Sequence, residues 1–207
     1  MNRDDALETI FHREKKSILT FCIIIANGLL FALECSGEGL TASHMLSLGA
    51  AFPPLIAEGQ YWRLISALFL HGSLRHLGSN MLGLLFFGDA AESRIGKLRF
   101  LTLYLGGGLL GNLFSFLHAS AAGEMTVSVG ASTSVFALFG YILVSFFKDS
   151  KRGIKTPIRR FLAYLVLALL SGFADPYIDG FAHLGGLVAG AALSVILIPG
   201  TKNGNPP

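Results

Sequence analysis

Six apolar runs, separated by short polar breaks, make up most of this chain. Each run carries almost no charge, as expected for a transmembrane helix, which needs about 20 predominantly apolar residues. The predicted spans cover residues 17–33, 74–88, 100–117, 125–147, 161–174 and 180–198. This pattern predicts an all-α membrane protein whose six transmembrane helices form one bundle.

The spans fill most of the 207 residues and leave no room for a second folded domain. We expect one membrane domain at residues 17–199, a short N-terminal segment at 1–16 and a short tail at 200–207. A cleaved signal peptide is the rival interpretation of the first run. That run is longer than a typical signal core and no small-x-small cleavage site follows it, so a retained helix is favoured.

The segment between the first two spans, residues 34–73, is the longest break in the pattern, yet it is rich in apolar side chains. Such a segment is expected to lie partly embedded in the outer membrane interface. Pro53 and Pro54 exclude one continuous helix there, because proline lacks the N–H donor that a helix interior requires.

Composition and charge agree with the membrane class. Hydrophobic residues make up 52% and charged residues only 14% of the chain, whereas soluble proteins average about 25% charged. All 16 Lys and Arg residues except Arg63 and Arg75 fall on one side of the six-span topology. The positive-inside rule then places both termini in the cytoplasm, and the net charge needs no nucleic-acid partner. The absence of an Arg-rich, acid-poor transit segment favours a bacterial plasma membrane.

Four polar side chains recur at one predicted depth. Spans two, four and six run from outside to inside, so their N-terminal ends share the outer leaflet. His76 and Asn80 are four residues apart and share a helix face, while Ser132 and His183 each lie roughly one turn inside their spans. Polar groups in hydrocarbon are costly unless they are partnered or face water, so we expect the four to converge in a wet pocket.

Such a cluster suits acyl transfer. A serine hydroxyl becomes a useful nucleophile when a neutral imidazole takes its proton, which assigns Ser132 as nucleophile and His183 as general base. His76, Asn80 and the backbone N–H of Ser132 are candidate donors to the developing oxyanion. Asp179 lies on the same side as His183, but it is better explained as the N-cap of the sixth span.

Small residues on spans four and six favour close helix packing. Gly130 and Gly140 lie on the fourth span and Gly186 and Gly190 on the sixth, where the latter two form a small-xxx-small pair. Such residues let two backbones approach closely enough for Ser132 to meet the histidine of the facing helix.

In this order the residues resemble the rhomboid family of intramembrane serine proteases. The shared residues are Trp62, Arg63, His71, His76, Asn80, Glu92, Gly96, Gly130, Ala131, Ser132, Ala182, His183, Gly186 and Gly190. The resemblance implies cleavage of transmembrane protein substrates near the outer membrane face by a Ser132–His183 dyad, with His76 and Asn80 on the oxyanion side. Phe136 matches the aromatic residue that the family places beside the histidine. We expect no cofactor and no metal.

One residue departs from the family pattern, and alternatives stay open. Thr133 stands where the motif usually has a second glycine, which puts a β-branched side chain near the oxyanion pocket or the sixth span. A catalytically inactive relative that binds transmembrane segments is therefore the main alternative. A small transporter or proton-coupled channel would carry charged groups inside several spans, and zinc would need a third strong ligand beside His71, His76 and His183. The oligomeric state is open.

Overall fold

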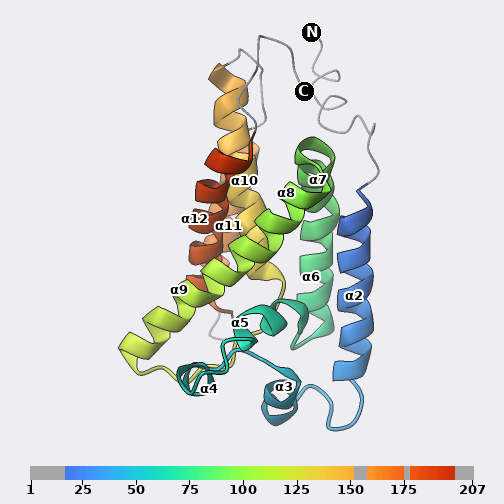
Figure 1. The fold of residues 1–207 in the computed structure, drawn as a ribbon, viewed down its shortest axis with the longest axis vertical. Helices are drawn as coiled ribbons and strands as arrows, with labels where there is room; N and C mark the ends of the chain where they lie inside the picture. The colour runs from blue at the N-terminus through green and yellow to red at the C-terminus, as the bar shows by residue number, and fades with distance from the viewer. Residues whose placement is uncertain (1–16, 152–157, 175–177, 199–207) are drawn as a thin grey trace.

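The computed structural model describes residues 17–151, 158–174 and 178–198. The terminal segments expected at 1–16 and 200–207 lie outside this described part. Apart from one isolated bridge between Ala51 and Ser128, the regular elements in these ranges are helices (Figure 1). They are α2 (Ile18–Glu34), α3 (Ala42–Leu48), α4 (Pro53–Ala57), α5 (Arg63–Ser66), η1 (Ala67–Phe69), α6 (Leu74–Gly83), η2 (Leu84–Gly88), α7 (Asp89–Ile95), α8 (Lys97–Leu101), η3 (Thr102–Gly106), α9 (Gly107–Ala122), α10 (Ser132–Lys151), α11 (Ile158–Ala174) and α12 (Gly180–Leu197).

Most predicted spans coincide with helices, but several helices are longer than the apolar runs. The second run continues through α6, η2 and α7 as far as Ile95, because helical hydrogen bonding extends past the first charged residues until Gly96, at φ +80°, ends it. The third run belongs to one continuous helix of 26 residues, Lys97–Ala122. In both helices a wide π-type turn, η2 or η3, interrupts the α-helical pattern.

The fourth span begins later than predicted. Residues 125–131 are not helical, and α10 starts at Ser132. Ser128 exchanges both backbone hydrogen bonds with Ala51, at 2.9 and 3.0 Å, and Gly130 has a φ of +129°, so the chain is extended and then turns before the helix. The expectation that Ser132 lies one turn inside its helix was therefore wrong. His183, the fourth residue of α12, does lie one turn in.

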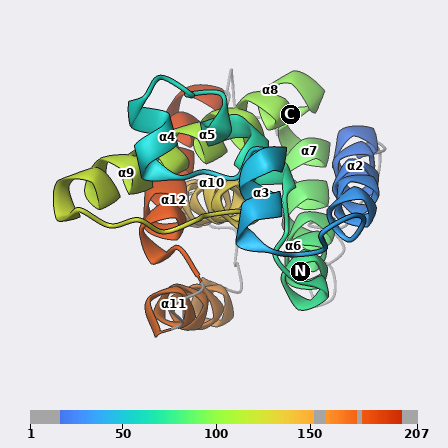
Figure 2. The same ribbon diagram turned by 90° about the horizontal axis from the view of Figure 1, so that it is seen from below.

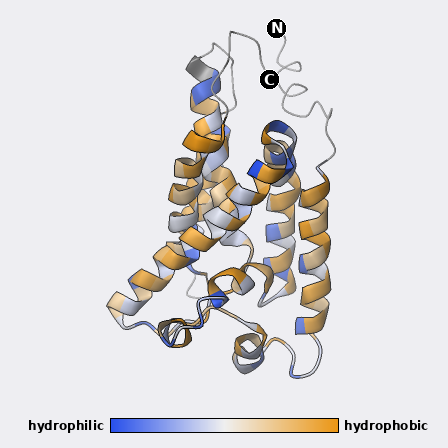
Figure 3. Ribbon diagram, in the orientation of Figure 1, coloured by the Kyte–Doolittle hydropathy of each residue, from blue (hydrophilic) through white to orange (hydrophobic). Residues whose placement is uncertain are grey.

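Two helices within the described ranges are long and apolar enough to cross a membrane by length and composition: Lys97–Ala122 and α12. The apolar helix α2 is slightly shorter, with 17 residues. Hydrophobic residues run along most of the length of the long helices (Figure 3).

The core lies around α10, which packs most extensively on α12 and α9. Large aromatic side chains fill it, and Tyr104, Tyr141 and Phe100 are fully buried. The short helices α3, α4 and α5 gather at one end of the bundle (Figure 1). Helix α11 lies at the edge, where its main neighbour is α12 (Figure 2).

The segment between α2 and α6 has its own organisation around Arg63. The guanidinium Nη1 donates to the carbonyls of Leu46 and Ala50 at 2.8 and 3.0 Å, and the indole of Trp62 lies 4.7 Å from its central carbon. Pro53 and Pro54 form the first turn of α4, so the expected break in the helix is confirmed. These contacts hold a loop that pairs with the segment before Ser132.

Candidate active site

The segment before Ser132 is fixed to the loop between α2 and α6. Besides the pairing of Ser128, the N–H of Gly130 donates to the carbonyl of Ala67 at 2.8 Å. A φ of +129° at Gly130 is a conformation that side-chain-bearing residues rarely adopt. This turn leaves Ser132 as the first residue of α10.

The structure brings Ser132 and His183 together from facing helices. The Ser132 hydroxyl oxygen and His183 Nε2 are 2.9 Å apart, a hydrogen-bonding distance. The phenyl ring of Phe136, one turn after Ser132 on α10, stacks on the imidazole with a centroid distance of 4.2 Å and an interplanar angle of 17°. When the imidazole carries its proton on Nδ1, Nε2 is free to accept the serine proton.

His76 and Asn80 lie on the same side of Gly130, as predicted from their spacing on one helix face. A Cβ atom added at Gly130 would fall 2.6 Å from His76 Nε2 and 3.4 Å from Asn80 Nδ2. Asn80 is buried, and its Nδ2 has no hydrogen-bond partner in the described part of the chain. The Ser73 hydroxyl caps α6 by accepting from the His76 N–H at 3.1 Å. The site therefore holds a buried amide donor beside the turn at Gly130.

His71 contacts both His76 and the residue before Ser132. It is fully buried; its Nε2 accepts from the N–H of Ala131 at 3.4 Å, and its ring meets His76 edge to face at 5.3 Å. Burial, together with the charge of His76, lowers the pKa of His71 from 6.5 to about 3. The ring is thus neutral and able to accept. The backbone N–H of His71 donates to the buried carboxyl group of Glu34 at 2.8 Å, a contact that sequence reasoning missed.

The Thr133 side chain contacts α9 and α12. Its hydroxyl donates to Asn112 Oδ1 at 2.9 Å, and Asn112 Nδ2 donates to the carbonyl of Leu64 at 2.8 Å. Its methyl group lies where side chains at Gly111 or Gly186 would otherwise be. Gly111 and Gly186 thus leave room for Thr133, the residue that departs from the family pattern.

Asp179 is the N-cap of α12, as predicted, and it has a second partner. Its carboxylate accepts from the Ala182 N–H at 2.8 Å and from the Ser115 hydroxyl at 2.6 Å. Sequence reasoning missed both Asn112 and Ser115. The signal was present, because these two polar residues, three apart in an apolar run, share a helix face.

A small pocket borders these bonds. Its lining includes Asn112, Ser115 and Asp179 together with residues of α4 and the segment before Gly130. Neither member of the Ser132–His183 pair lines it. Within the described ranges, no group of three or more His, Cys, Asp and Glu side chains could hold a metal ion.

Comparison with known proteins agrees with this geometry. A family model described as the rhomboid domain matches residues 58–200, well over half of the chain. The chain belongs to the rhomboid family. Members of this family are integral membrane proteins.

Individual relatives from distant organisms extend the match. "Rhomboid protease GluP" of Bacillus subtilis (strain 168) is 31% identical over 181 residues, which are 87% of this chain and 35% of that protein. "Rhomboid-like protease 1" of Toxoplasma gondii is 33% identical over 199 residues, 92% of this chain and 67% of that protein. "RHOMBOID-like protein 5" of Arabidopsis thaliana is 39% identical over 162 residues, 77% of this chain and 52% of that protein. The chain thus spans only about a third of GluP and about half of the Arabidopsis protein.

Proposed function

We propose that this chain is an intramembrane serine endopeptidase that cleaves transmembrane protein substrates near the outer membrane face. Ser132 is the nucleophile and His183 the general base. The observation that carries the proposal is the 2.9 Å contact between the serine hydroxyl and His183 Nε2 beside a buried, unpartnered Asn80 amide. The protease names of the relatives support the same reaction class.

In the first step, Ser132 attacks the carbonyl carbon of the scissile peptide bond as its proton passes to His183 Nε2. The carbonyl oxygen becomes an oxyanion. In this proposal Asn80 Nδ2, the His76 ring and the backbone N–H of Ser132 donate to it, which the position of the first two beside Gly130 supports. Donors of this kind, fixed in place before the reaction, lower the barrier by several kcal/mol, roughly 3–4 for one donor.

In the second step, the imidazolium returns its proton to the leaving amine and the tetrahedral intermediate collapses to an acyl-enzyme on Ser132. A water molecule, deprotonated by His183, then attacks the ester carbonyl. His183 returns this proton to the Ser132 oxygen as the ester C–O bond breaks, which releases the new carboxyl terminus and restores the serine hydroxyl. Phe136 holds the plane of the imidazole through both proton transfers by its stacking contact.

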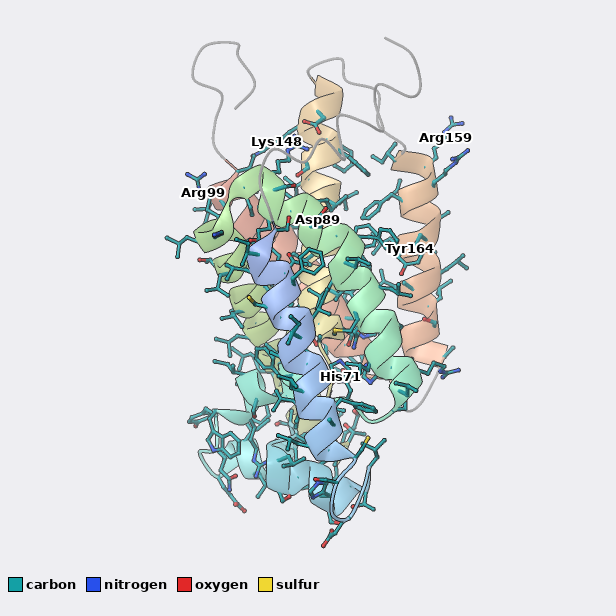
Figure 4. The ribbon with its side chains drawn as sticks, turned by 90° about the vertical axis from the view of Figure 1, so that its right-hand side faces the viewer. His71, Asp89, Arg99, Lys148, Arg159 and Tyr164 are labelled. Carbon is teal, nitrogen blue, oxygen red and sulfur yellow. The ribbon has the colours of Figure 1, made fainter. Side chains whose placement is uncertain are left out.

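The membrane arrangement belongs to the same proposal. Six spans, formed by α2, α6–α7, α8–α9, α10, α11 and α12, make a membrane domain at residues 17–199 with both termini cytoplasmic. Arg99, Lys148 and Arg159 lie toward the end of the bundle far from His71 (Figure 4), which suits a cytoplasmic face under the positive-inside rule. A bacterial plasma membrane remains the proposed location.

Reaction of the purified protein with a serine-directed fluorophosphonate tests the assignment. Wild type is expected to be labelled, whereas Ser132→Ala and His183→Ala are expected to lose labelling because one lacks the nucleophile and the other its base. Ser194→Ala is the matched control, since this buried α12 serine only donates to the Gly190 carbonyl of its own helix, at 2.6 Å.

Equal labelling of wild type and both dyad variants would reject the assignment of Ser132 as nucleophile and His183 as base. Unlabelled wild type that still binds a transmembrane peptide would instead identify an inactive relative, the alternative raised by Thr133. Labelling that depends on both residues, with cleavage of a membrane-anchored substrate by wild type alone, would support the protease.

A further inference from the structure

Helix α9 contributes no member of the proposed dyad, yet two of its polar side chains reach the segments that carry the dyad. Asn112 bonds the residue next to Ser132, and Ser115 bonds the N-cap of the helix that carries His183. The two residues are three apart, so they lie on one face of α9 one above the other. A single helix face is thus tied to both partners of the proposed reaction.

The bond between Asn112 and Thr133 is one of two linked hydrogen bonds. Asn112 accepts from the Thr133 hydroxyl and donates to the Leu64 carbonyl, so it links α10 to α5 through α9. Thr133 is 3% and Asn112 7% exposed. Buried polar groups that are fully paired fix one arrangement, because any other leaves a donor or acceptor unsatisfied. The position of Ser132 along α10 is thereby fixed relative to α9.

The bond on the base side acts through the start of α12. Asp179 accepts from Ser115 with one carboxylate oxygen and from the Ala182 N–H with the other. The backbone N–H of His183 donates to the Asp179 carbonyl at 3.2 Å, which joins the cap residue directly to the base. Movement of Asp179 would carry His183 with it.

The direct contact between α10 and α12 does not supply this alignment by itself. The two helices meet through Gly140, Gly186 and Gly190, where added Cβ atoms would overlap the facing backbone. Glycines permit close approach but carry no side-chain hydrogen bonds. In the described part of the chain, the directional side-chain contacts between α10 and α12 are those of the proposed site itself, the Ser132–His183 hydrogen bond and the stacking of Phe136. Hydrogen bonds to a third helix are also directional, and they add a restraint that lies outside the reacting groups.

We propose that α9 positions the dyad, with Asn112 and Ser115 setting the axial alignment of Ser132 and His183 through Thr133 and Asp179. This inference rests on the proposed serine protease function. Both α9 side chains are positioning residues, since neither contacts the reacting atoms. Thr133 gains a role that glycine could not fill, because glycine has no hydroxyl for Asn112.

The test measures fluorophosphonate labelling rates, kcat and KM for a membrane-anchored substrate, and thermal unfolding of each variant. Thr133→Val keeps the methyl group between the glycines but removes the hydroxyl, and Ser115→Ala removes the other bond. Each is expected to lower the labelling rate and kcat about 10- to 100-fold with little change in KM, as for a small misplacement of reacting groups. Ser194→Ala serves again as the buried control, because the hydroxyl bond that it removes lies within α12.

Conservative variants separate positioning from packing. Thr133→Ser keeps the hydroxyl, and Asp179→Asn keeps a cap and a partner for Ser115, so both are expected to retain activity within about threefold of wild type. Combining Thr133→Val with Asn112→Leu should cost no more than Asn112→Leu alone, because both remove the same bond. Combining Thr133→Val with Ser115→Ala should multiply the two losses, because the bonds act on different helices.

Several outcomes would overturn the inference. One is a kcat within twofold of Ser194→Ala for both Thr133→Val and Ser115→Ala in folded protein. Loss of thermal stability in these variants without loss of kcat would assign α9 to packing alone. If Thr133→Val does not fold, Ser115→Ala and Asp179→Asn decide the question by the same measurements. Wild type that is itself unlabelled would reject the proposed function, and this inference with it. Labelled wild type with unaffected variants would reject this inference alone.

Discussion

The two ends of the helical bundle are joined by different kinds of contact. At the end that holds the dyad, single hydrogen bonds and close backbone contacts surround Ser132, and most involve neutral groups. At the opposite end, charged side chains join the helices: Glu92 accepts from the N–H groups of Leu19 and Thr20 at 3.0 and 2.7 Å, and Arg94 forms a two-point ion pair with Asp149. Figure 4 shows further basic residues, Arg99 and Lys148 among them, at this second end.

This difference predicts that variants at one end affect the alignment of Ser132 and His183, whereas variants at the other end affect the free energy of unfolding. The contacts near the dyad act on residues adjacent to the reacting atoms, so their loss should lower reactivity more than it lowers the free energy of unfolding. The charged contacts at the opposite end join α2, α7 and α10 far from the dyad, so their loss should have the reverse effect. Variants at either end test this predicted difference.

The largest effect is expected where α10 and α12 touch. In Gly190→Leu a new side chain would overlap the Ala137 carbonyl of the facing helix. Overpacking of this kind costs about 1–3 kcal/mol or more, here beside the dyad, so we expect no labelling and little folded protein. Gly28→Leu on α2, where a Cβ meets nothing within 4 Å, is the control and should label like wild type. Full activity of Gly190→Leu would refute the close contact.

The next effect is expected at Glu92. In Glu92→Ala the first N–H groups of α2 and the Thr20 hydroxyl lose a buried acceptor. Loss of such a charge-assisted set lowers the free energy of unfolding by roughly 2–4 kcal/mol. Unfolding of the protein in mixed detergent and SDS micelles measures this loss, with the exposed Glu124→Ala as control. The folded fraction should be labelled at the wild-type rate; a slower rate would show that the two ends are coupled.

A pH effect is expected at His71, on the dyad side. Its pKa is about 3 in the folded protein against 6.5 ordinarily, so the unfolded chain binds a proton more readily. This difference in pKa leaves the free energy of unfolding unchanged above about pH 6.5 and lowers it as the pH falls from 6.5 toward 3. The slope is at most about 1.4 kcal/mol per pH unit, or roughly 2 kcal/mol between pH 6.5 and 5.

Unfolding measured at several pH values tests this contribution. The His71→Gln variant is expected to lack that slope, whereas the control variant His118→Gln, altered on α9, should keep it. An identical pH dependence in His71→Gln and wild type would contradict the assignment.

The smallest effect is expected at the ion pair of Arg94 and Asp149. The Arg94 side chain is 40% exposed, against 8% for Asp149, so solvent screens the attraction and Arg94→Gln should cost about 1 kcal/mol or less. Exchanging the two residues, Arg94→Asp with Asp149→Arg, should restore part of the loss in the same unfolding assay. A loss larger than that of Glu92→Ala would mean that the ion pair, and not the buried Glu92 carboxylate, contributes most to stability at this end.

The sequence predicted the helical class and the place of most long helices, because apolar runs report directly on burial in lipid or core. It also predicted the shared face of His76 and Asn80 and the cap at Asp179, since both follow from local spacing. The start of α10 was missed because hydropathy does not register a turn at Gly130. The partners of Asn112 and Ser115 were missed because they lie 21 and 64 residues away in the chain. Contacts of that kind depend on how helices assemble, and local patterns do not encode them.

The start of α10 at Ser132 has an electrostatic consequence. The aligned peptide dipoles of this 20-residue helix place partial positive charge at its first residues, which is where the proposed tetrahedral intermediate bears its negative charge. The field of the helix therefore favours that charge without a lysine or arginine, whose transfer from water into a membrane interior would be costly. A nucleophile set deeper in the helix would sit away from this positive pole.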